Sequence, residues 1–174
     1  LVTKYGEGSS ELACQMYDAI AELEGKIIKP AVPAATATYK ETAIAVNGSL
    51  LQSPSGLTVP QAVSRLVKRA GQDTTVQNAI RDKAFFAWIP SGDTCAFCLT
   101  IASRGFQRAS KKALKNGHAE HIHANCDCAY CTSFQEDATV EGYQPEKLKE
   151  LYYSQEGTPT EKINAIRREN YAKN

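Results

Sequence analysis

Side chains that bind metal ions crowd into one short stretch of this sequence. Five of the six cysteines and all three histidines lie between residues 95 and 131, in the order Cys95, Cys98, His118, His121, His123, Cys126, Cys128 and Cys131. The Cys95-x-x-Cys98 spacing brings two thiolates to one side of a tight turn, about the separation that a tetrahedral Zn²⁺ requires. A second group of soft ligands downstream can complete the tetrahedron. The stretch therefore predicts a structural zinc site.

The sequence offers more ligands than one closed zinc site needs, because structural sites use four and exclude water. The candidate metal ligands are Cys95, Cys98, His123, Cys126 and Cys128. We expect Cys95 and Cys98 to supply two ligands and the other three candidates to supply the remaining two, with Cys131 as an alternative. His118 and His121 lie in a polar, lysine-rich segment and are expected to be solvated.

Disulfide bonds are one alternative use of six cysteines. Disulfide frameworks spread their cysteines to join distant loops, whereas here only Cys14 lies apart from the rest. A chain of 174 residues can also bury a core without covalent cross-links. Cys14 has Leu12 and Met16 as neighbours, so it is expected to be a small buried apolar residue. The spacing favours metal binding over disulfides.

A zinc-dependent hydrolase or deaminase is a second alternative. His118-x-Glu120 and Cys128-x-x-Cys131 imitate the H-x-E…P-C-x-x-C signature of zinc deaminases, in which the glutamate transfers protons. The interval from Glu120 to Cys128 is too short for the strand that separates the two motifs in a deaminase, and no proline precedes Cys128. No nucleophile triad, phosphate-binding loop or dinucleotide fingerprint is present either. We therefore expect no enzymatic activity.

The elements that position the cluster are predicted to be mainly helical. The expected helices are 9–29, 31–46, 58–70, 74–84, 95–104, 145–153 and 159–171, and the expected strand is 85–89. In the first of them, Leu12, Met16, Ile20 and Leu23 form an apolar stripe that should pack on another helix. In the helix that carries Cys95 and Cys98, Asp93 and Thr94 are the expected N-caps and Gly105 is the expected stop.

The predicted fold class is mainly α, in three regions. Residues 1–84 form a helical N-terminal part, residues 85–136 a small α+β zinc-knuckle-like region, and residues 137–174 a charged helical extension. No stretch has the roughly 18 apolar residues of a membrane span. No basic-then-apolar leader marks the chain for secretion, and the first residue is Leu rather than Met, so we expect a fragment or a processed product.

The formal net charge of +1 gives no global attraction to nucleic acid, so any such contact needs a local patch. The candidate is the basic run of Arg104, Arg108, Lys111, Lys112 and Lys115. This run is either a solvated loop or a contact with DNA phosphates or with an acidic partner surface.

The sequence from Trp88 to Gly105, read as Trp-Ile-Pro-Ser-Gly-Asp-Thr-Cys-Ala-Phe-Cys-Leu-Thr-Ile-Ala-Ser-Arg-Gly, is followed by His123-Ala-Asn-Cys126-Asp-Cys128. This pattern resembles the signature of the Mu F-like minor head proteins of tailed phages, the head-morphogenesis or minor capsid family. By this resemblance Cys95, Cys98, His123, Cys126 and Cys128 are the family-motif positions, whereas Cys131 departs from the motif.

The resemblance implies a structural virion protein made in the host cytoplasm. It would be carried inside the capsid near the portal, in several copies, and would act in head assembly. Its expected partners are the portal protein, the major capsid protein or both, together with packaged DNA, and no membrane. The expected cofactor is structural Zn²⁺.

Overall fold

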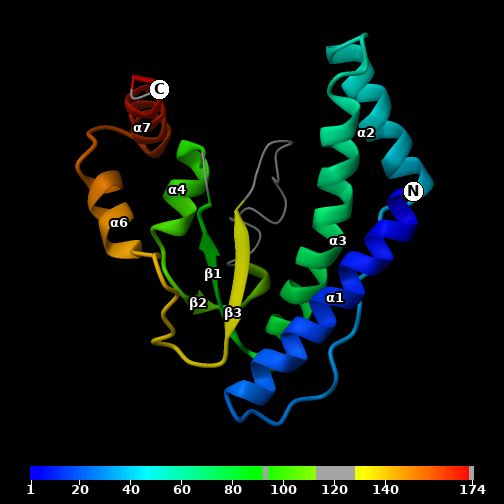
Figure 1. Ribbon diagram of the computed structural model, residues 1–174. Helices are drawn as coiled ribbons and strands as arrows, with labels where there is room; N and C mark the ends of the chain where they lie inside the picture. The colour runs from blue at the N-terminus through cyan, green and yellow to red at the C-terminus, as the bar shows by residue number, and fades with distance from the viewer. Residues whose placement is uncertain (92–93, 113–127, 173–174) are drawn as a thin grey trace.

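The protein is mainly helical, as predicted, with a small antiparallel sheet. A computed structural model describes residues 1–91, 94–112 and 128–172. The elements in order are α1 (Val2–Leu23), α2 (Tyr39–Gln52), α3 (Val59–Asp82), β1 (Phe85–Ile89), α4 (Ala96–Ala102), β2 (Gln107–Arg108), β3 (Ala129–Ser133), α6 (Pro145–Tyr153) and α7 (Pro159–Ala172). The sheet lies between α1 and α3 on one side and α4, α6 and α7 on the other (Figure 1).

Helix α1 buries the face that its apolar stripe does not occupy. The predicted packing of that stripe is wrong, because Leu12 is 57% exposed, Met16 58% and Leu23 87%. The buried face carries mostly small residues, namely Val2, Gly6, Ser10, Cys14, Tyr17 and Ala21. Small side chains let α1 and α3 approach closely: a Cβ on Gly71 of α3 would lie 2.6 Å from the Ser9 Oγ. The predicted helices 58–70 and 74–84 are in fact one helix, since α3 runs through Gly71 without a break.

The segment between α1 and α2 is extended, so the predicted helix 31–46 is wrong in its first part. Helix α1 ends at Leu23, before Gly25 at φ +65°, rather than at Lys29. Helix α2 begins only after Thr38, which forms a reciprocal cap with Glu41. The Thr38 Oγ1 accepts from the Glu41 N–H at 3.2 Å, and the Glu41 carboxylate accepts from the Thr38 N–H at 2.8 Å. The cap sets the start of α2 because it satisfies free amide groups of the first turn.

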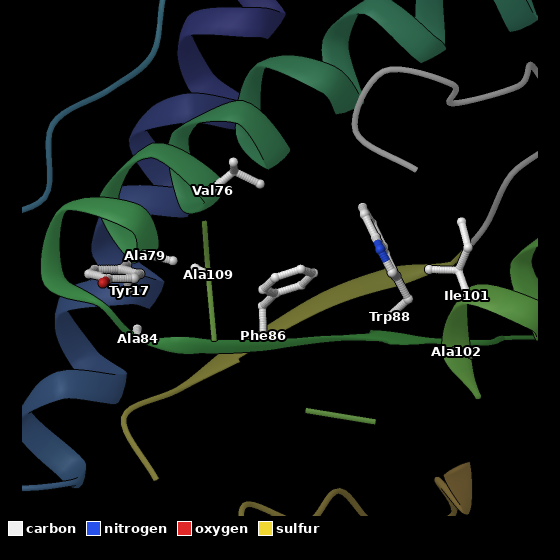
Figure 2. Packing of buried hydrophobic residues seen from close by; sticks show 9 residues of the cluster. All are labelled: Tyr17, Val76, Ala79, Ala84, Phe86, Trp88, Ile101, Ala102 and Ala109. Carbon is white, nitrogen blue, oxygen red and sulfur yellow. The ribbon is translucent and has the colours of Figure 1, made fainter. Parts of the chain in front are cut away.

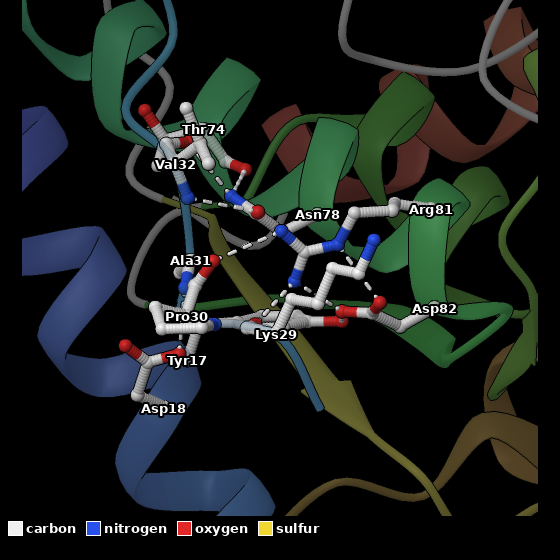
Figure 3. A network of polar contacts seen from close by, with 10 residues as sticks. All are labelled: Tyr17, Asp18, Lys29, Pro30, Ala31, Val32, Thr74, Asn78, Arg81 and Asp82. Carbon is white, nitrogen blue, oxygen red and sulfur yellow. Dashed lines mark hydrogen bonds and ion pairs between the residues drawn. The ribbon is translucent and has the colours of Figure 1, made fainter. Parts of the chain in front are cut away.

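Side chains of α3 hold this extended segment, residues 29–34, which we call the strap. Asn78 binds the strap as a neighbouring strand would: its Oδ1 accepts from the Val32 N–H at 3.0 Å, and its Nδ2 donates to the Val32 carbonyl at 2.9 Å (Figure 3). The Thr74 Oγ1 accepts from the Ala34 N–H at 2.9 Å. The strap thus gains hydrogen bonds without belonging to a sheet, as buried backbone groups require.

Arg81 fastens the start of the strap. Its guanidinium donates to the carbonyls of Lys29 (2.7 Å) and Pro30 (3.0 Å) and pairs with Asp82 at 2.7 Å. The Tyr17 hydroxyl donates to the same Asp82 carboxylate at 3.1 Å. Burial and the adjacent Asp82 charge raise the pKa of Tyr17, so this phenol stays protonated and remains a donor. One cluster therefore joins α1, the strap and α3.

The sheet has the order β2-β1-β3, with both neighbours antiparallel to β1. The predicted strand Phe85–Ile89 is confirmed as its centre. The main core draws on α1, α3, β1 and α4, and includes Tyr17, Val76, Ala79, Phe86, Trp88 and Ile101 (Figure 2). Tyr130 of β3 covers this core, because its ring stacks on Phe86 at 5.2 Å and meets Trp88 edge-on at 4.8 Å.

The two C-terminal helices begin where their prolines predicted. Helix α6 matches the predicted bounds, and α7 ends one residue later than predicted. Both pack on α4. Ile166 of α7 is only 1% exposed, and the Tyr143 hydroxyl before α6 donates to the Ala102 carbonyl. Whether residues 137–174 form a separate region, as the three-part division predicts, stays a prediction.

Candidate metal centre

Cys95 itself caps the helix that carries the first cysteine pair. It precedes α4 with an extended backbone (φ −67°, ψ 155°), and its Sγ accepts from the Cys98 N–H at 3.4 Å. The prediction that Thr94 caps the helix is wrong, because the Thr94 hydroxyl donates to the Ser91 carbonyl at 3.2 Å. Asp93 lies outside the described residues. Cys95 thus places its sulfur at the N-terminal end of α4.

Three of the predicted ligands meet in one cluster. Cys98 and Cys128 are buried, at 2% and 8% exposure, and pack together with Cys95 and Phe97. Cys128 comes directly before β3, and the pairing of β3 with β1 brings it back to α4 across a long interval of sequence. The first turn of a helix and the start of a strand therefore bring three cysteines into one packed cluster. Three sulfur ligands from two segments are typical of structural zinc sites.

The described part of the chain does not by itself complete a metal site. Within residues 1–91, 94–112 and 128–172, no three His, Cys, Asp or Glu side chains are arranged to hold a metal ion. The predicted ligands His123 and Cys126 lie outside these residues, as do His118, Glu120 and His121. The chemistry of the sulfur cluster fits zinc, since thiolates are its preferred structural ligands, and a fourth ligand would come from His123 or Cys126.

Cys131 does not join the cluster. It lies on β3 opposite Ala87, three residues after Cys128 and therefore on the other face of the strand. Burial, and then the carboxylate of Glu24, raise the pKa of its thiol and disfavour the thiolate. The deaminase-like motif requires Cys128 and Cys131 to act together, which their placement does not support. The five cysteines that the structure describes form no disulfide with one another.

A family model described as "VG15 protein" matches residues 1–155, from α1 through the end of α6. The chain belongs to the VG15 protein family. This is a family of phage proteins. No curated protein and no solved structure matches the chain. The resemblance to Mu F-like minor head proteins is finer than this family and stays a prediction.

The basic run of this VG15 protein lies around β2. Arg104, Arg108, Lys111 and Lys112 are exposed, and Lys115 lies outside the described residues. The Arg108 guanidinium lies 4.7 Å from the centre of the Phe85 ring and donates to the Lys83 carbonyl at 3.4 Å. Strand pairing thus adds exposed Lys83 to the basic run, which the sequence order alone did not indicate. None of the described helices is long and apolar enough to cross a membrane.

Proposed function

We propose that this VG15 protein is a structural minor head protein of a tailed phage, which acts in capsid assembly near the portal and carries a structural zinc ion. Membership of a phage family supports the viral part of the proposal. The observation that carries the zinc part is the convergence of Cys95, Cys98 and Cys128. The protein would lie inside the capsid in several copies and would catalyse no reaction.

In this proposal zinc ties α4 to β3. Cys95 and Cys98 hold it from the first turn of α4, Cys128 holds it from the start of β3, and His123 or Cys126 completes the set. The zinc ion supplies bonds between segments that otherwise meet through few apolar side chains. The sheet contributes only five residues from each of its two longer strands, so such a tie would fix the register of β3 on β1.

The zinc site is tested by elemental analysis of the purified full chain and its cysteine variants. We expect one zinc per chain, lost in Cys95→Ser, Cys98→Ser and Cys128→Ser. Cys131→Ser and Cys14→Ser are matched controls, since the first lies on β3 outside the cluster and the second is buried in α1. Zinc that persists in all three cluster variants, or no zinc in the wild-type chain, would refute the site.

The head-protein role is tested in the phage. We expect mass spectrometry of purified virions to find the protein in several copies, and cross-linking to join it to the portal or major capsid protein. Particles made without it should show defective heads. A protein that is made in infected cells but is absent from virions and from immature heads would contradict the role.

A second candidate function is contact with packaged DNA through Lys83, Arg104, Arg108, Lys111 and Lys112. The observation that favours it is the pairing of β2 with β1, which brings Lys83 to the basic run. Neutralising phosphates releases counterions, so binding to duplex DNA should fall steeply with salt. Affinity that is unchanged when Lys83, Lys111 and Lys112 are replaced by Gln would dismiss this function.

A further inference from the structure

The three cysteines of the sulfur cluster (Cys95, Cys98 and Cys128) differ in their exposure to solvent. Cys95 is half-buried, whereas Cys98 is 2% exposed and Cys128 is 8% exposed. An oxidant that arrives from solvent reacts only with a thiolate that it can reach, so exposure decides which sulfur reacts first. Within this cluster, the sulfur that an oxidant reaches first is that of Cys95.

The nearest partner for an oxidised Cys95 is Cys98. The Cys95 Sγ accepts from the Cys98 N–H at 3.4 Å, and both residues pack in the same cluster. A cysteine sulfur is separated from its own amide nitrogen only by Cα and Cβ, so a rotation of the Cys98 side chain can bring the two sulfurs together. Because the pair lies in one turn at the start of α4, a bond between them requires no movement of β3. Cys-x-x-Cys pairs form reversible disulfides in redox proteins.

The other two cysteines that the structure describes, Cys14 and Cys131, are poorer sites of oxidation. Cys14 is buried in α1, and Cys131 is half-buried on the face of β3 away from the cluster. Burial raises the pKa of both thiols, so little of either is the reactive thiolate. They provide matched controls for the cluster.

We propose that the sulfur cluster is a redox-sensitive zinc site, in which oxidised glutathione or a similar small disulfide converts Cys95 and Cys98 to a disulfide and releases the ion. This inference rests on the proposed zinc site. The cytoplasm keeps thiols reduced, whereas the medium outside a cell is oxidising. A head protein passes from one to the other when virions leave the host. Zinc would therefore hold α4 to β3 during assembly and would be lost afterwards.

The reaction is two successive thiol–disulfide exchanges. The Cys95 thiolate attacks one sulfur of oxidised glutathione, whose S–S bond breaks, and one glutathione thiolate leaves. The Cys98 thiolate then attacks the Cys95 sulfur of this mixed disulfide and displaces the second glutathione thiolate. The two cysteine sulfurs lose two electrons in total, and oxidised glutathione gains them. Zinc leaves as Zn²⁺, because thiolates are its ligands and the disulfide has none.

The test uses the full-length, zinc-loaded protein and measures zinc before and after oxidised glutathione is added. We expect the zinc to be released into solution, where a coloured chelator detects it, and to bind again after reduction with dithiothreitol. Amides of β3 should exchange faster in the oxidised protein, while amides of α1 and α3 keep their protection.

Peptide mapping identifies the bond that forms. Trypsin cuts after Lys83 and Arg104, so Cys95 and Cys98 fall in one tryptic peptide, which should become lighter by two hydrogen atoms. Chymotrypsin cuts after Phe97, between the two cysteines, and the resulting pieces should stay joined until the disulfide is reduced.

The outcomes separate this inference from the proposed zinc site. A protein that contains no zinc before oxidation would refute the site and the inference with it. If zinc is present but stays bound in oxidised glutathione, the inference fails and the zinc site stands. The inference also fails if the new disulfide joins Cys95 to any cysteine other than Cys98.

A ligand exchange at the exposed position tests the order of attack. Cys95→His keeps a side chain that zinc accepts but removes the first thiolate, so oxidised glutathione should release zinc from it at least about tenfold more slowly. Cys131→Ser and Cys14→Ser should release zinc at the wild-type rate. Release from Cys95→His at the wild-type rate would overturn the inference. If this variant takes up no zinc, the disulfide map of the wild-type protein decides alone.

Discussion

The helical half of this protein (residues 1–82) and its sheet half (residues 84–172) are stabilised in different ways. The helical half relies on small residues that let α1 and α3 approach and on side chains that bind the strap backbone. The sheet half contributes most of the aromatic core and the sulfur cluster. Among described residues, the strongly exposed large apolar side chains lie in residues 1–57, with Tyr153 as the exception.

The two halves also differ in how they use large apolar side chains. In the helical half, many of them stay exposed rather than packing into the core. In the sheet half, the corresponding side chains are used internally. A change to one of these stabilising interactions should therefore affect one half more than the other, and four experiments test this contrast.

Metal removal should have the largest effect and should be confined to the sheet half. A structural zinc ion contributes on the order of 10 kcal/mol to the fold around it. We expect a chelator to change the fluorescence of Trp88, the single tryptophan, while amides of α1 and α3 keep their protection from exchange. If the Trp88 fluorescence changes and the α1 and α3 amides lose their protection at the same time, the two halves unfold as one unit. If the chelator changes neither, the protein is not stabilised by zinc.

Asn78→Ala should cost about 2–3 kcal/mol of unfolding free energy, because the buried Asn78 side chain makes two hydrogen bonds to the Val32 backbone and one to the Thr74 carbonyl, and the variant loses all three. Gln77→Ala is the control, since the neighbouring Gln77 is exposed and should lie within about 0.5 kcal/mol of the wild type. Denaturant titration measures both. Equal stability of the two variants would mean that the strap does not hold the helical half together.

Gly71→Ala should destabilise the protein by about 1–3 kcal/mol, because its Cβ would lie 2.6 Å from the Ser9 Oγ and 3.1 Å from the Ser9 carbonyl oxygen. Gly48→Ala in α2 meets nothing within 4 Å and should instead stabilise the protein by about 0.5–1 kcal/mol, since alanine favours a helix. Thermal melts of the two variants should move in opposite directions. If the melting temperatures of both variants shift in the same direction, the close approach of α1 and α3 at Gly71 does not determine the stability.

The smallest effect concerns pH and the start of α2. Hydrogen bonds from Thr38 lower the pKa of Glu41 below its ordinary value of 4.5. The cap therefore contributes stability at pH above that value, and the contribution is lost as the pH falls through the lower folded-state pKa. In Glu41→Gln, the hydrogen exchange rates of the α2 amides should depend less on acid pH than in the wild type, because the cap no longer titrates. Because Glu41 is exposed to solvent, the difference should be small, and an equally steep acid response in the variant would rule out the cap as its source.

The sequence predicts best those elements whose signals are local. Pro145 and Pro159 locate the starts of α6 and α7, and the aromatic run before Pro90 locates β1. The capping pair of Thr38 and Glu41 was not predicted, because the alanine-rich stretch before it indicated an earlier helix start. Local sequence signals predict an element boundary correctly when one residue determines it. They predict it wrongly when tertiary hydrogen bonds hold a segment in an extended conformation.

The errors arise where a choice depends on distant parts of the chain. The Leu12 and Met16 stripe has ideal helical spacing, yet the small-residue face of α1 is buried because α3 offers Gly71 there. Strand β3 was not predicted, since its five residues gain strand structure only by pairing with β1.

For the candidate site, Cys95, Cys98 and Cys128 pack near one another, but the described residues are not arranged to hold a metal ion, so the predicted ligand set stays a prediction. The sequence could not decide the place of Cys131, because its orientation depends on the register of β3.

The strap has a consequence for the order of events during synthesis. Val32 leaves the ribosome 46 residues before its partner Asn78, and the first three helices have all their mutual contacts once Asp82 has emerged. The sheet cannot form completely until Ser133 has been synthesised. Its central strand β1 pairs with β2, which follows soon after it, and with β3, which is made much later. The nascent chain can therefore complete its helical half before Cys128 has emerged, and under the proposed zinc site metal capture would be a late step in maturation.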